Sequence, residues 1–392
     1  MSLGFSDLSV ELEQIKQDKL YRSRRIISSP QGVIVEMDGK SLINFSSNDY
    51  LGLANHPQVI SAFKQATDNY GVGSGSAHLI CGHSYSHHAL EQELAGFTGR
   101  DRALLFSTGY MANLGVITAL LGRGDAVFED RLNHASLLDG GLLSTAKFKR
   151  YCHNDLEDLQ HKISKVNTEN RALIVTDGVF SMDGDMADLP ALAAVAKQNN
   201  AWLMVDDAHG FGVLGETGAG VIEKQGLTQQ QVPVLMGTLG KGFGTFGAFV
   251  AGSDVLIETL IQKARSYVYT TAMPAAIAEA TRASLKLVIK DNWRREKLNG
   301  LVKRFRVGAG QLGLALMNSD SAIQPLLVGD SECAVQLSEM LLEQGFLVGA
   351  IRPPTVPKGQ ARLRVTFSAN HNEQQVDQLL EALSVASAKL RT

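Results

Sequence analysis

Short apolar runs alternate with helix-like stretches from about Arg102 onward, and this alternation restricts the possible fold more than any other feature. Five of the runs are ALLF, ALIVTDGV, AWLMVDD, PVLMGT and GAFVAG. Stretches between some of them, such as GYMANLGVITALL and LPALAAVAKQNN, resemble amphipathic helices. Continuous apolar strands separated by helices are typical of parallel sheets that are buried on both faces. We therefore predict an α/β fold with a mostly parallel central sheet and helices on both faces.

The pattern of apolar runs and helix-like stretches changes near residue 276. A long charged helical stretch, RREKLNGLVKRFRVGAGQL, precedes shorter strand-like and helical segments and a final helix near residues 372–389. The first 45 residues contain a helix-like stretch and one strand-like run, GVIVEMDG. We predict an N-terminal helix and strand segment over residues 1–45, a large domain over 46–275 and a small α+β C-terminal domain over 276–392.

Composition excludes several kinds of protein. The 392 residues have a net charge of −3 and are 44% hydrophobic, so a large core is possible and no general attraction to nucleic acid or membrane is implied. No apolar run approaches the ~20 residues of a membrane helix. The N-terminus, MSLGFSDLSVELEQIKQDKL, lacks the pattern of a signal peptide. Three scattered cysteines form no disulfide framework or zinc-ligand pattern, so we expect a cytoplasmic protein without a metal.

A single lysine stands in a glycine-rich stretch, GTLGKGFGTFG, between two apolar runs. A P-loop is excluded because Gly242 follows Lys241 where a hydroxyl should bind magnesium. A dinucleotide fingerprint is disfavoured because a strand-like run follows the glycines where a helix is needed. Two interpretations remain: a hairpin with a solvated lysine, or a lysine that forms a Schiff base with a flat aldehyde cofactor. The second needs clearance beside Lys241, which glycine supplies, and apolar surroundings that lower the pKa of the amine.

Pyridoxal phosphate, the aldehyde cofactor in question, needs a carboxylate at its pyridine nitrogen, and AWLMVDDAHG offers one. Asp206 follows an apolar run, at the carboxyl end of a predicted strand where α/β enzymes bind ligands. His209 can reach the phenolic oxygen of the ring, and Ala208 is small enough to pack on one ring face. In the alternatives, Asp206 caps a helix and His209 lies at the surface, or the two bind a metal, for which no third ligand has suitable spacing.

Three further segments supply the remaining contacts that this cofactor needs. ALLFSTGYMANLG places Gly109 and Tyr110 between a strand and a helix, where backbone amides can bind phosphate. EDRLNHASLLDG places His134 at the start of a helical run, and TDGVFSMDGD places Ser181 in a loop after a strand. Each segment is common by itself, but their order along the chain, ending at Lys241, favours pyridoxal phosphate.

Five motifs together, SNDYLGL, NHASLLDG, FSMDGD, VDDAHG and TLGKGFG, resemble the α-oxoamine synthases, which are fold-type I pyridoxal phosphate enzymes. The resemblance runs from about Asn44 to His371 and implies a homodimer with active sites at the interface. It also implies a condensation of an amino acid with an acyl-CoA, with loss of CO2. IQPLLVGD and AIRPPTVPKGQARLRVTFSA are most similar to members that join L-alanine to pimeloyl-CoA or the pimeloyl carrier protein in biotin synthesis. Members that use glycine and a short acyl-CoA are the alternative, which RPPTVP disfavours.

The resemblance implies roles for the residues in the matching motifs. Lys241 would carry the cofactor and transfer the proton, Asp206 would hold the pyridine nitrogen, and His134 would stack on the ring and face the substrate. The implied cofactor contacts are Gly109, Tyr110, Ser181, Asp206, His209, Thr238, Lys241 and, from the partner subunit, Thr270 or Thr271. The implied substrate contacts are Arg22 and Thr355 for the acyl group, Asn48 and Arg364 for the alanine carboxylate, and His134.

One loop, GVGSGSAHLICG, departs from the family pattern, which usually reads G-S-G-G-[ST]-[RG]. It carries Ser76, Ala77 and His78 in its second half. Because this loop lies near the acyl-chain site in relatives, the exact acyl donor stays open. Two readings from other classes have little support. A nicotinamide oxidoreductase would rest on GFGTFG alone, and a cofactor-bound regulator would need a basic helix-turn-helix, which the sequence does not show.

Overall fold

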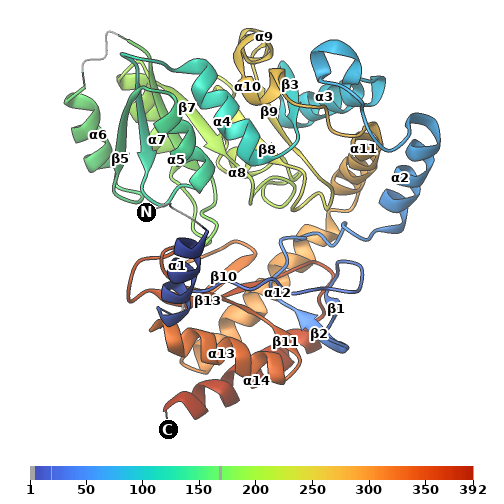
Figure 1. Cartoon of the computed structure of the whole chain (residues 1–392), viewed down its shortest axis with the longest axis vertical. Coiled ribbons are helices and arrows are strands. Elements are labelled where there is room, and N and C mark those ends of the chain that lie inside the picture. The colour runs from blue at the N-terminus through green and yellow to red at the C-terminus, as the bar shows by residue number, and fades with distance from the viewer. Residues whose placement is uncertain (1–4, 19, 167–169, 392) are drawn as a thin grey trace.

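The computed structural model describes residues 5–18, 20–166 and 170–391, which form a large upper body and a smaller lower body (Figure 1). The upper body contains a seven-stranded sheet with helices on both faces. The lower body contains two three-stranded sheets with their own helices. The predicted α/β architecture with a smaller α+β part is confirmed, whereas the domain boundaries at residues 45 and 275 stay predictions.

The large sheet has the strand order β3-β9-β8-β7-β6-β4-β5 and is parallel except for β9, which is antiparallel to both neighbours. Every residue of β6 is buried, which explains the unbroken apolar run in its sequence. The apolar pattern does not predict edge strand β5, KFKRY, because most of its side chains are exposed. The strands are β3 (Arg102–Phe106), β4 (Ala126–Asp130), β5 (Lys147–Tyr151), β6 (Ala172–Asp177), β7 (Trp202–Asp206), β8 (Val234–Thr238) and β9 (Ala248–Gly252).

Two helical layers cover this sheet, because successive side chains of each strand point to opposite faces. Leu173 and Val175 of β6 belong to one apolar cluster, with α4 (Gly109–Leu120), α5 (Ala135–Leu143), α9 (Asp254–Lys263) and α10 (Arg265–Val268). Ile174 belongs to the other, with α3 (Tyr85–Thr98), α6 (Leu156–Ser164), α7 (Leu189–Gln198), α8 (Val221–Lys224) and α11 (Ala275–Lys290). A π-helix, η1 (His78–Gly82), precedes α3, and α2 (Pro57–Tyr70) packs against α11.

Strands from both ends of the chain build the lower body. β2 (Lys40–Asn44) pairs with β1 (Ile34–Met37) and, in parallel, with β11 (Phe346–Leu347). The second small sheet contains, in order, β10 (Ile323–Gly329), β13 (Ala361–Thr366) and β12 (Gly349–Ile351). The helices of this body are α12 (Trp293–Gln311), α13 (Ser331–Glu343) and α14 (Glu373–Arg391). The N-terminal strands therefore pack on the C-terminal part of the chain.

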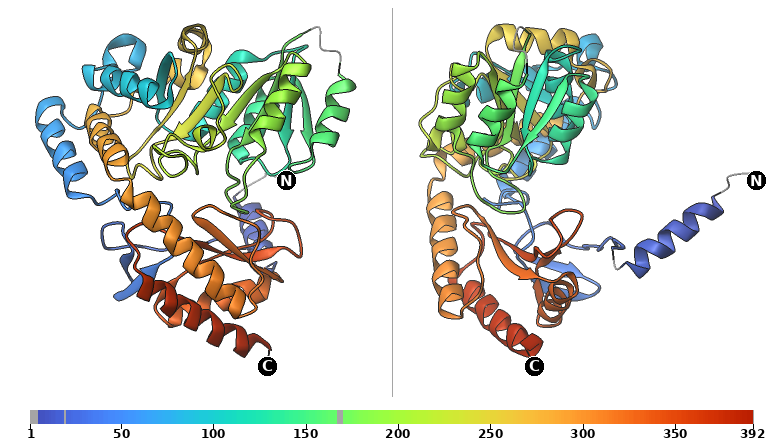
Figure 2. Two further views of the ribbon diagram at one scale, coloured as in Figure 1. Left: turned by 180° about the vertical axis from the view of Figure 1, so that it is seen from behind. Right: turned by 90° about the vertical axis from the view of Figure 1, so that its left-hand side faces the viewer.

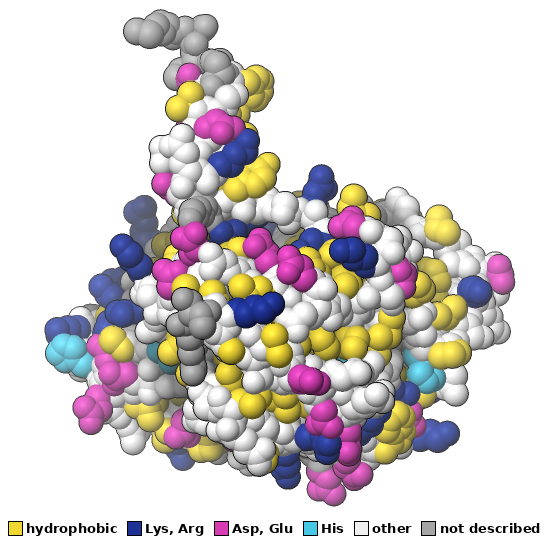
Figure 3. Space-filling view, turned by 90° about the horizontal axis from the view of Figure 1, so that it is seen from below, with side chains coloured by type: hydrophobic (Ala, Val, Ile, Leu, Met, Phe, Trp, Pro, Cys, Tyr) yellow, Lys and Arg dark blue, Asp and Glu magenta, His cyan; other side chains and the backbone are white. Residues whose placement is uncertain are grey.

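Helix α1 (Ser6–Gln17) stands away from the rest of the molecule, as Figure 2 shows from the side and Figure 3 from below. Its apolar side chains Leu8, Leu12 and Ile15 are exposed. None of the helices within residues 5–18, 20–166 and 170–391 is long and apolar enough to cross a membrane.

Candidate active site

A cavity of about 180 Å³ lies where the parallel strands end. Asp206, the last residue of β7, and Thr238, the last residue of β8, both line it. This is the edge at which parallel α/β sheets bind ligands. The predicted site residues that line the cavity are Gly109, Tyr110, His134, Ser181, Asp206, His209, Thr238 and Lys241.

Lys241 lies in the loop between β8 and β9, and its Nζ is 2.8 Å from Nε2 of His209. Burial lowers the pKa of the amine to about 8, against the attraction of Asp206 and Asp177, which raises it. Lys241 is therefore not the solvated lysine of a simple hairpin. Its amine can lose a proton near neutral pH, as a nucleophile or general base must.

Glycine is required after Lys241 for a different reason from the clearance beside the lysine that the sequence suggests. A Cβ atom at Gly242 would lie 2.9 Å from the carbonyl oxygen of Phe211. Gly244 has a φ of +64°, and a Cβ atom there would lie 2.3 Å from the amide nitrogen of Ala54. Glycine permits both the close approach and the left-handed backbone. These two residues therefore fix the loop that carries Lys241.

A chain of hydrogen bonds leads from Lys241 across the site. Nδ1 of His209 lies 2.6 Å from Oη of Tyr50, which donates to Oδ1 of Asn48 at 3.2 Å. The same Asn48 oxygen accepts from Nη1 and Nη2 of Arg364, each at 3.2 Å. Burial lowers the pKa of His209 well below its usual range, so its neutral ring can accept from one neighbour and donate to the other. The chain joins Lys241 to the two residues predicted to hold the substrate carboxylate.

Two partners fix the carboxylate of Asp206. Its Oδ1 accepts from the amide of Ala208 at 2.9 Å, and its Oδ2 accepts from Nδ2 of Asn113 at 2.7 Å. Asn113 also donates to Oγ of Ser136 at 2.8 Å. Sequence reasoning misses Asn113 because it lies inside the apolar helix α4. Its one available signal is its position a turn after Gly109, on the face that begins at the cavity.

A second buried carboxyl group, Asp177, stands opposite Asp206 in the register of β6 and β7. Burial, and then the charge of Asp206, raise the pKa of Asp177 well above its usual range. Asp177 is therefore protonated more readily than an ordinary aspartate. Its Oδ2 accepts from the backbone amide of His134 at 3.1 Å. Sequence reasoning misses Asp177, although ALIVTD ends in aspartate in the same way as WLMVD.

His134 is the N-cap residue of α5, and its orientation is fixed by Ser136. The Nδ1 atom lies 2.7 Å from Oγ of Ser136 and accepts from the Ser136 amide at 3.3 Å. Burial lowers the pKa of His134, although the charge of Asp206 opposes this effect. The ring is thus held in a defined orientation beside the cavity, which Ala208 also lines.

The start of α4 meets the same cavity. Thr108 caps the helix by accepting from the amide of Met111 at 3.1 Å. The first-turn amides near Gly109 and Tyr110 face away from the helix interior and can bind an anion. Oγ1 of Thr238 donates to the carbonyl oxygen of Gly247 at 3.1 Å, which positions its hydroxyl near the loop of Lys241.

Thr270 and Thr271 do not line this cavity. They lie in the segment after α10, and Thr271 forms an antiparallel bridge with Ala77 of the atypical loop.

Arg22 and Thr355 also lie outside the cavity, but the structure brings their segments together. Nη2 of Arg352 donates to the carbonyl oxygen of Tyr21 at 3.0 Å, and the amide of Thr355 donates to the carbonyl oxygen of Arg352 at 3.1 Å. Arg22 is exposed. The segments that carry Arg22 and Thr355 are therefore neighbours outside the cavity.

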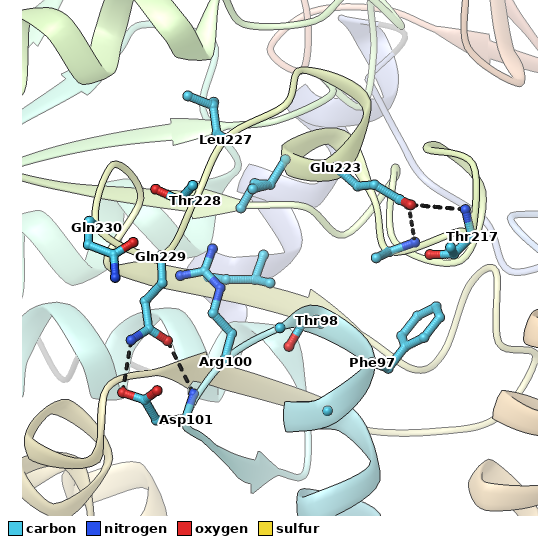
Figure 4. Close-up of a pocket in the computed structure, with 15 residues that line it drawn as sticks. Phe97, Thr98, Arg100, Asp101, Thr217, Glu223, Leu227, Thr228, Gln229 and Gln230 are labelled. Carbon is cyan, nitrogen blue, oxygen red and sulfur yellow. Dashed lines mark hydrogen bonds between the residues drawn. The ribbon is translucent and has the colours of Figure 1, made fainter.

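A larger cleft, of about 480 Å³, contains none of the predicted site residues (Figure 4). Its polar groups bind one another: Gln229 donates to Asp101 at 2.9 Å, and Glu223 accepts from the amide of Thr217 at 3.0 Å. The guanidinium group of Arg100 donates to the carbonyl oxygen of Val232. These contacts connect the segment before β8 to the start of β3 and give the cleft a structural explanation.

Comparison with known proteins gives relatives over almost the entire length. The family model for aminotransferase class I and II matches residues 40–383. The 8-amino-7-oxononanoate synthase of Saccharophagus degradans is 63% identical over 381 residues, which cover 97% of this chain and 96% of the relative. The enzyme of the same name from Thioalkalivibrio sulfidiphilus is also 63% identical, over 96% of each chain.

Solved structures also match this chain over almost its entire length. A structure of SPT with a PLP internal aldimine superposes with a TM-score of 0.93 at 32% identity, over 98% of both chains. The serine palmitoyltransferase of Sphingomonas wittichii gives a TM-score of 0.93 at 34% identity, over 98% of this chain and 97% of that one. The 8-amino-7-oxononanoate synthase of Francisella tularensis gives 0.78 at 33% identity, over 90% and 99%.

Proposed function

The chain belongs to the aminotransferase class I and II family and, within it, to the 8-amino-7-oxononanoate synthases, and from this we propose that it condenses L-alanine with a pimeloyl thioester in biotin biosynthesis. It is a transferase that uses pyridoxal phosphate. The thioester is pimeloyl-CoA or the pimeloyl carrier protein. The contact between Lys241 and His209, in one cavity with Asp206, is the observation that carries the proposal.

The residues of the cavity fit the cofactor. Lys241 supplies an amine with a lowered pKa, and Asp206 supplies a fixed carboxylate at the end of β7. The buried Oδ1 atom of Asn113, next to Asp206, has no hydrogen-bond partner among the residues that the structure describes, as is expected where a ligand completes a site. We propose that the start of α4 and Thr238 hold the phosphate, and that His134 and Ala208 contact the ring. When bound, pyridoxal phosphate stabilises negative charge on the carbon atom that has lost its proton.

The chain's own groups then handle the proton and the carboxylate. Arg364 and Asn48 bind the carboxylate of alanine and orient its Cα–H bond toward Lys241. The neutral amine of Lys241 takes this proton as a general base and later returns one to the product. His209 holds the amine in place through the contact at 2.8 Å. His134, with its lowered pKa, faces the substrate as a neutral hydrogen-bonding group.

We propose that the acyl donor is bound along Arg22 and Thr355. The hydrogen bonds of Arg352 to Tyr21 and of Thr355 to Arg352 support this arrangement, because they connect both segments outside the cavity. A terminal carboxylate on the acyl chain would complement the charge of Arg22.

We also propose a homodimer in which each subunit completes the other's site with Thr270 or Thr271. The segments on either side of the Ala77–Thr271 bridge carry apolar side chains that are largely exposed in the single chain, namely Val72 (83%), Ile80 (79%) and Tyr269 (72%). Exposed apolar side chains gathered in this way are typical of a surface that another protein covers. The free cysteines Cys81, Cys152 and Cys333 are compatible with the expected cytoplasmic location.

Turnover of two amino acids with three thioesters tests the proposed function. Purified enzyme is assayed with alanine or glycine, each crossed with pimeloyl-, acetyl- and succinyl-CoA, by following CoA release. Alanine with pimeloyl-CoA should give the highest kcat/KM, and a methyl group in a matched pocket should favour alanine over glycine by roughly 10- to 200-fold. A preference for glycine with acetyl- or succinyl-CoA would establish the alternative member of the family instead.

A further inference from the structure

Four of the ten histidines of the chain lie within residues 78–88, and the proposed function uses none of them. We propose that His83, His88 and Glu91 form a binding site for a divalent transition-metal ion of the zinc class. One ligand atom from each of these side chains lies within 4.8 Å of the other two. The inference does not depend on the proposed function.

The local fold places the three residues on one side of α3. His88 and Glu91 are three residues apart in this helix, so their side chains are neighbours on its surface. His83 stands just before Ser84, the N-cap residue of α3. The turn out of η1 brings its ring back over the first turn of the helix, where its Nε2 atom lies 3.8 Å from Oε2 of Glu91.

Hydrogen bonds within the cluster leave suitable atoms free for a metal. Nδ1 of His83 lies 2.9 Å from Nδ1 of His78, so the Nε2 atom of His83 is the one directed toward Glu91. A histidine ligand usually binds a metal through one nitrogen while the other is held by a hydrogen bond of this kind. His87 is different, because Ser84 and the carbonyl oxygen of Met273 occupy both of its nitrogens. His87 therefore holds the helix in place.

Glu91 is a carboxylate that lacks a strong partner. One oxygen, Oε1, accepts from the amide of Leu105 at 3.0 Å. Its side chain is only 13% exposed, and its one ion-pair contact within the described residues is the 3.8 Å approach to His83. Buried carboxylates are normally paired or coordinate a metal. A cation between Glu91 and the two histidines would provide the missing charge.

Two imidazoles and one carboxylate form a ligand set that zinc uses in proteins, with the remaining position taken by water. Ligands of tetrahedral zinc lie about 3.3 Å apart, given metal–ligand distances near 2.0–2.1 Å. Nε2 of His83 and Oε2 of Glu91 lie 3.8 Å apart, and every pair of ligand atoms lies within 4.8 Å, so the side chains must move closer to bind the ion. The exposed side chain of His88 can rotate toward the other two. Because His88 is exposed, the ion would also be able to enter and exchange from solvent.

The site would also stabilise a neighbouring segment. The ring of His78, which contacts His83, stacks on Tyr267 with a centroid distance of 4.9 Å. Ala77, the residue before it, bridges Thr271. A metal bound to His83 would therefore restrain the loop that departs from the family pattern.

Calorimetric titration of untagged holoenzyme with zinc chloride tests the proposal. The wild type should bind one zinc ion per chain. His88→Gln and Glu91→Gln should each weaken binding by at least about tenfold. His161→Gln, which changes an exposed histidine of α6 outside the cluster, should leave the affinity unchanged. The visible absorbance of the cofactor is followed in parallel, so that zinc taken up by the cofactor itself is recognised.

No zinc uptake by the wild type would overturn the proposal, and so would equal affinity in the wild type and His88→Gln. Zinc binding that bleaches the cofactor band to the same extent in both proteins would overturn it as well. Glu91 accepts a backbone hydrogen bond, so Glu91→Gln is first checked for folding by circular dichroism. If this variant does not fold, His88→Gln decides alone, because the His88 side chain is exposed and forms no hydrogen bond within the described residues.

Discussion

The Nζ atom of Lys241 lies 2.8 Å from Nε2 of His209, and both side chains face the cavity in which Asp206 ends β7. This contact places a buried amine next to a ring that burial keeps neutral. The neutral ring of His209 can hold the lysine in one position. It adds no positive charge that would make protonation of the Lys241 amine still harder. The geometry therefore supports a lysine that gains and loses a proton close to neutral pH.

The reactivity of Lys241 should rise through about pH 8. Burial lowers the pKa of its amine to about 8, so the neutral, nucleophilic form should predominate above that pH and the ammonium form below it. Reductive methylation of the apoenzyme at a series of pH values, read by peptide mass spectrometry, measures this midpoint. In Asp206→Asn the midpoint should move to lower pH, because the charge of Asp206 raises the pKa. A midpoint near the ordinary lysine value of ~10.4 would contradict the proposed environment.

Asp206→Asn should reduce kcat by roughly 10²- to 10³-fold, whereas cofactor affinity should change much less. The neutral amide cannot keep the pyridine nitrogen protonated, but the lysine and phosphate contacts remain. Steady-state kinetics and equilibrium dialysis of the cofactor measure the two effects separately. Asp254→Asn, an exposed change at the start of α9, is the matched control. If excess cofactor restored full activity to Asp206→Asn, Asp206 would only anchor the cofactor.

Mixed dimers should recover activity from two inactive parents. Lys241→Ala removes the amine, and the double variant Thr270→Val, Thr271→Val removes the hydroxyls proposed to act in the partner's site. A heterodimer of the two contains one site with both defects and one site with neither, so about half of the wild-type activity should return. The heterodimer is isolated with two different affinity tags and assayed for CoA release. An inactive heterodimer would place the threonines and Lys241 in the same subunit's site.

Arg22→Ala should reduce kcat/KM for pimeloyl-CoA by roughly 10- to 100-fold, the effect of one charge-assisted hydrogen bond. The loss should be small with heptanoyl-CoA, which is similar in length but lacks the terminal carboxylate. Arg24→Ala, two residues away in the same basic cluster, is the control. Equal losses with both thioesters would assign Arg22 to the CoA phosphates or to the fold, and the Ser76–His78 loop would be the next place to look for specificity.

The sequence predicts those parts of the site that follow strand ends. Asp206 and Lys241 are recognisable because an apolar run precedes each of them and few other residue types fit their surroundings. The central sheet is equally predictable, since burial on both faces requires continuous apolar runs. Strand β5 escapes prediction because an edge strand with mostly exposed side chains needs no such run.

The sequence does not predict the residues that support Asp206 and Lys241, for a different reason. Asn113 reaches Asp206 from the interior of an apolar helix, and the pairing of Asp177 with Asp206 depends on which strands are neighbours in the sheet. Neither contact is local in the sequence. The role of Gly244 is likewise set by the distant backbone of Ala54, which sequence spacing alone does not reveal.

Borohydride reduction of the purified enzyme, followed by peptide mass spectrometry, is the decisive test of Lys241 as the lysine that carries pyridoxal phosphate. The visible cofactor band should disappear, and the mass of reduced pyridoxal phosphate should be found on the peptide containing Lys241. Lys241→Ala should retain its folded circular dichroism spectrum, carry no such adduct and show no turnover of alanine with pimeloyl-CoA. An adduct on another lysine, or near-normal turnover by Lys241→Ala, would show that Lys241 does not carry the cofactor.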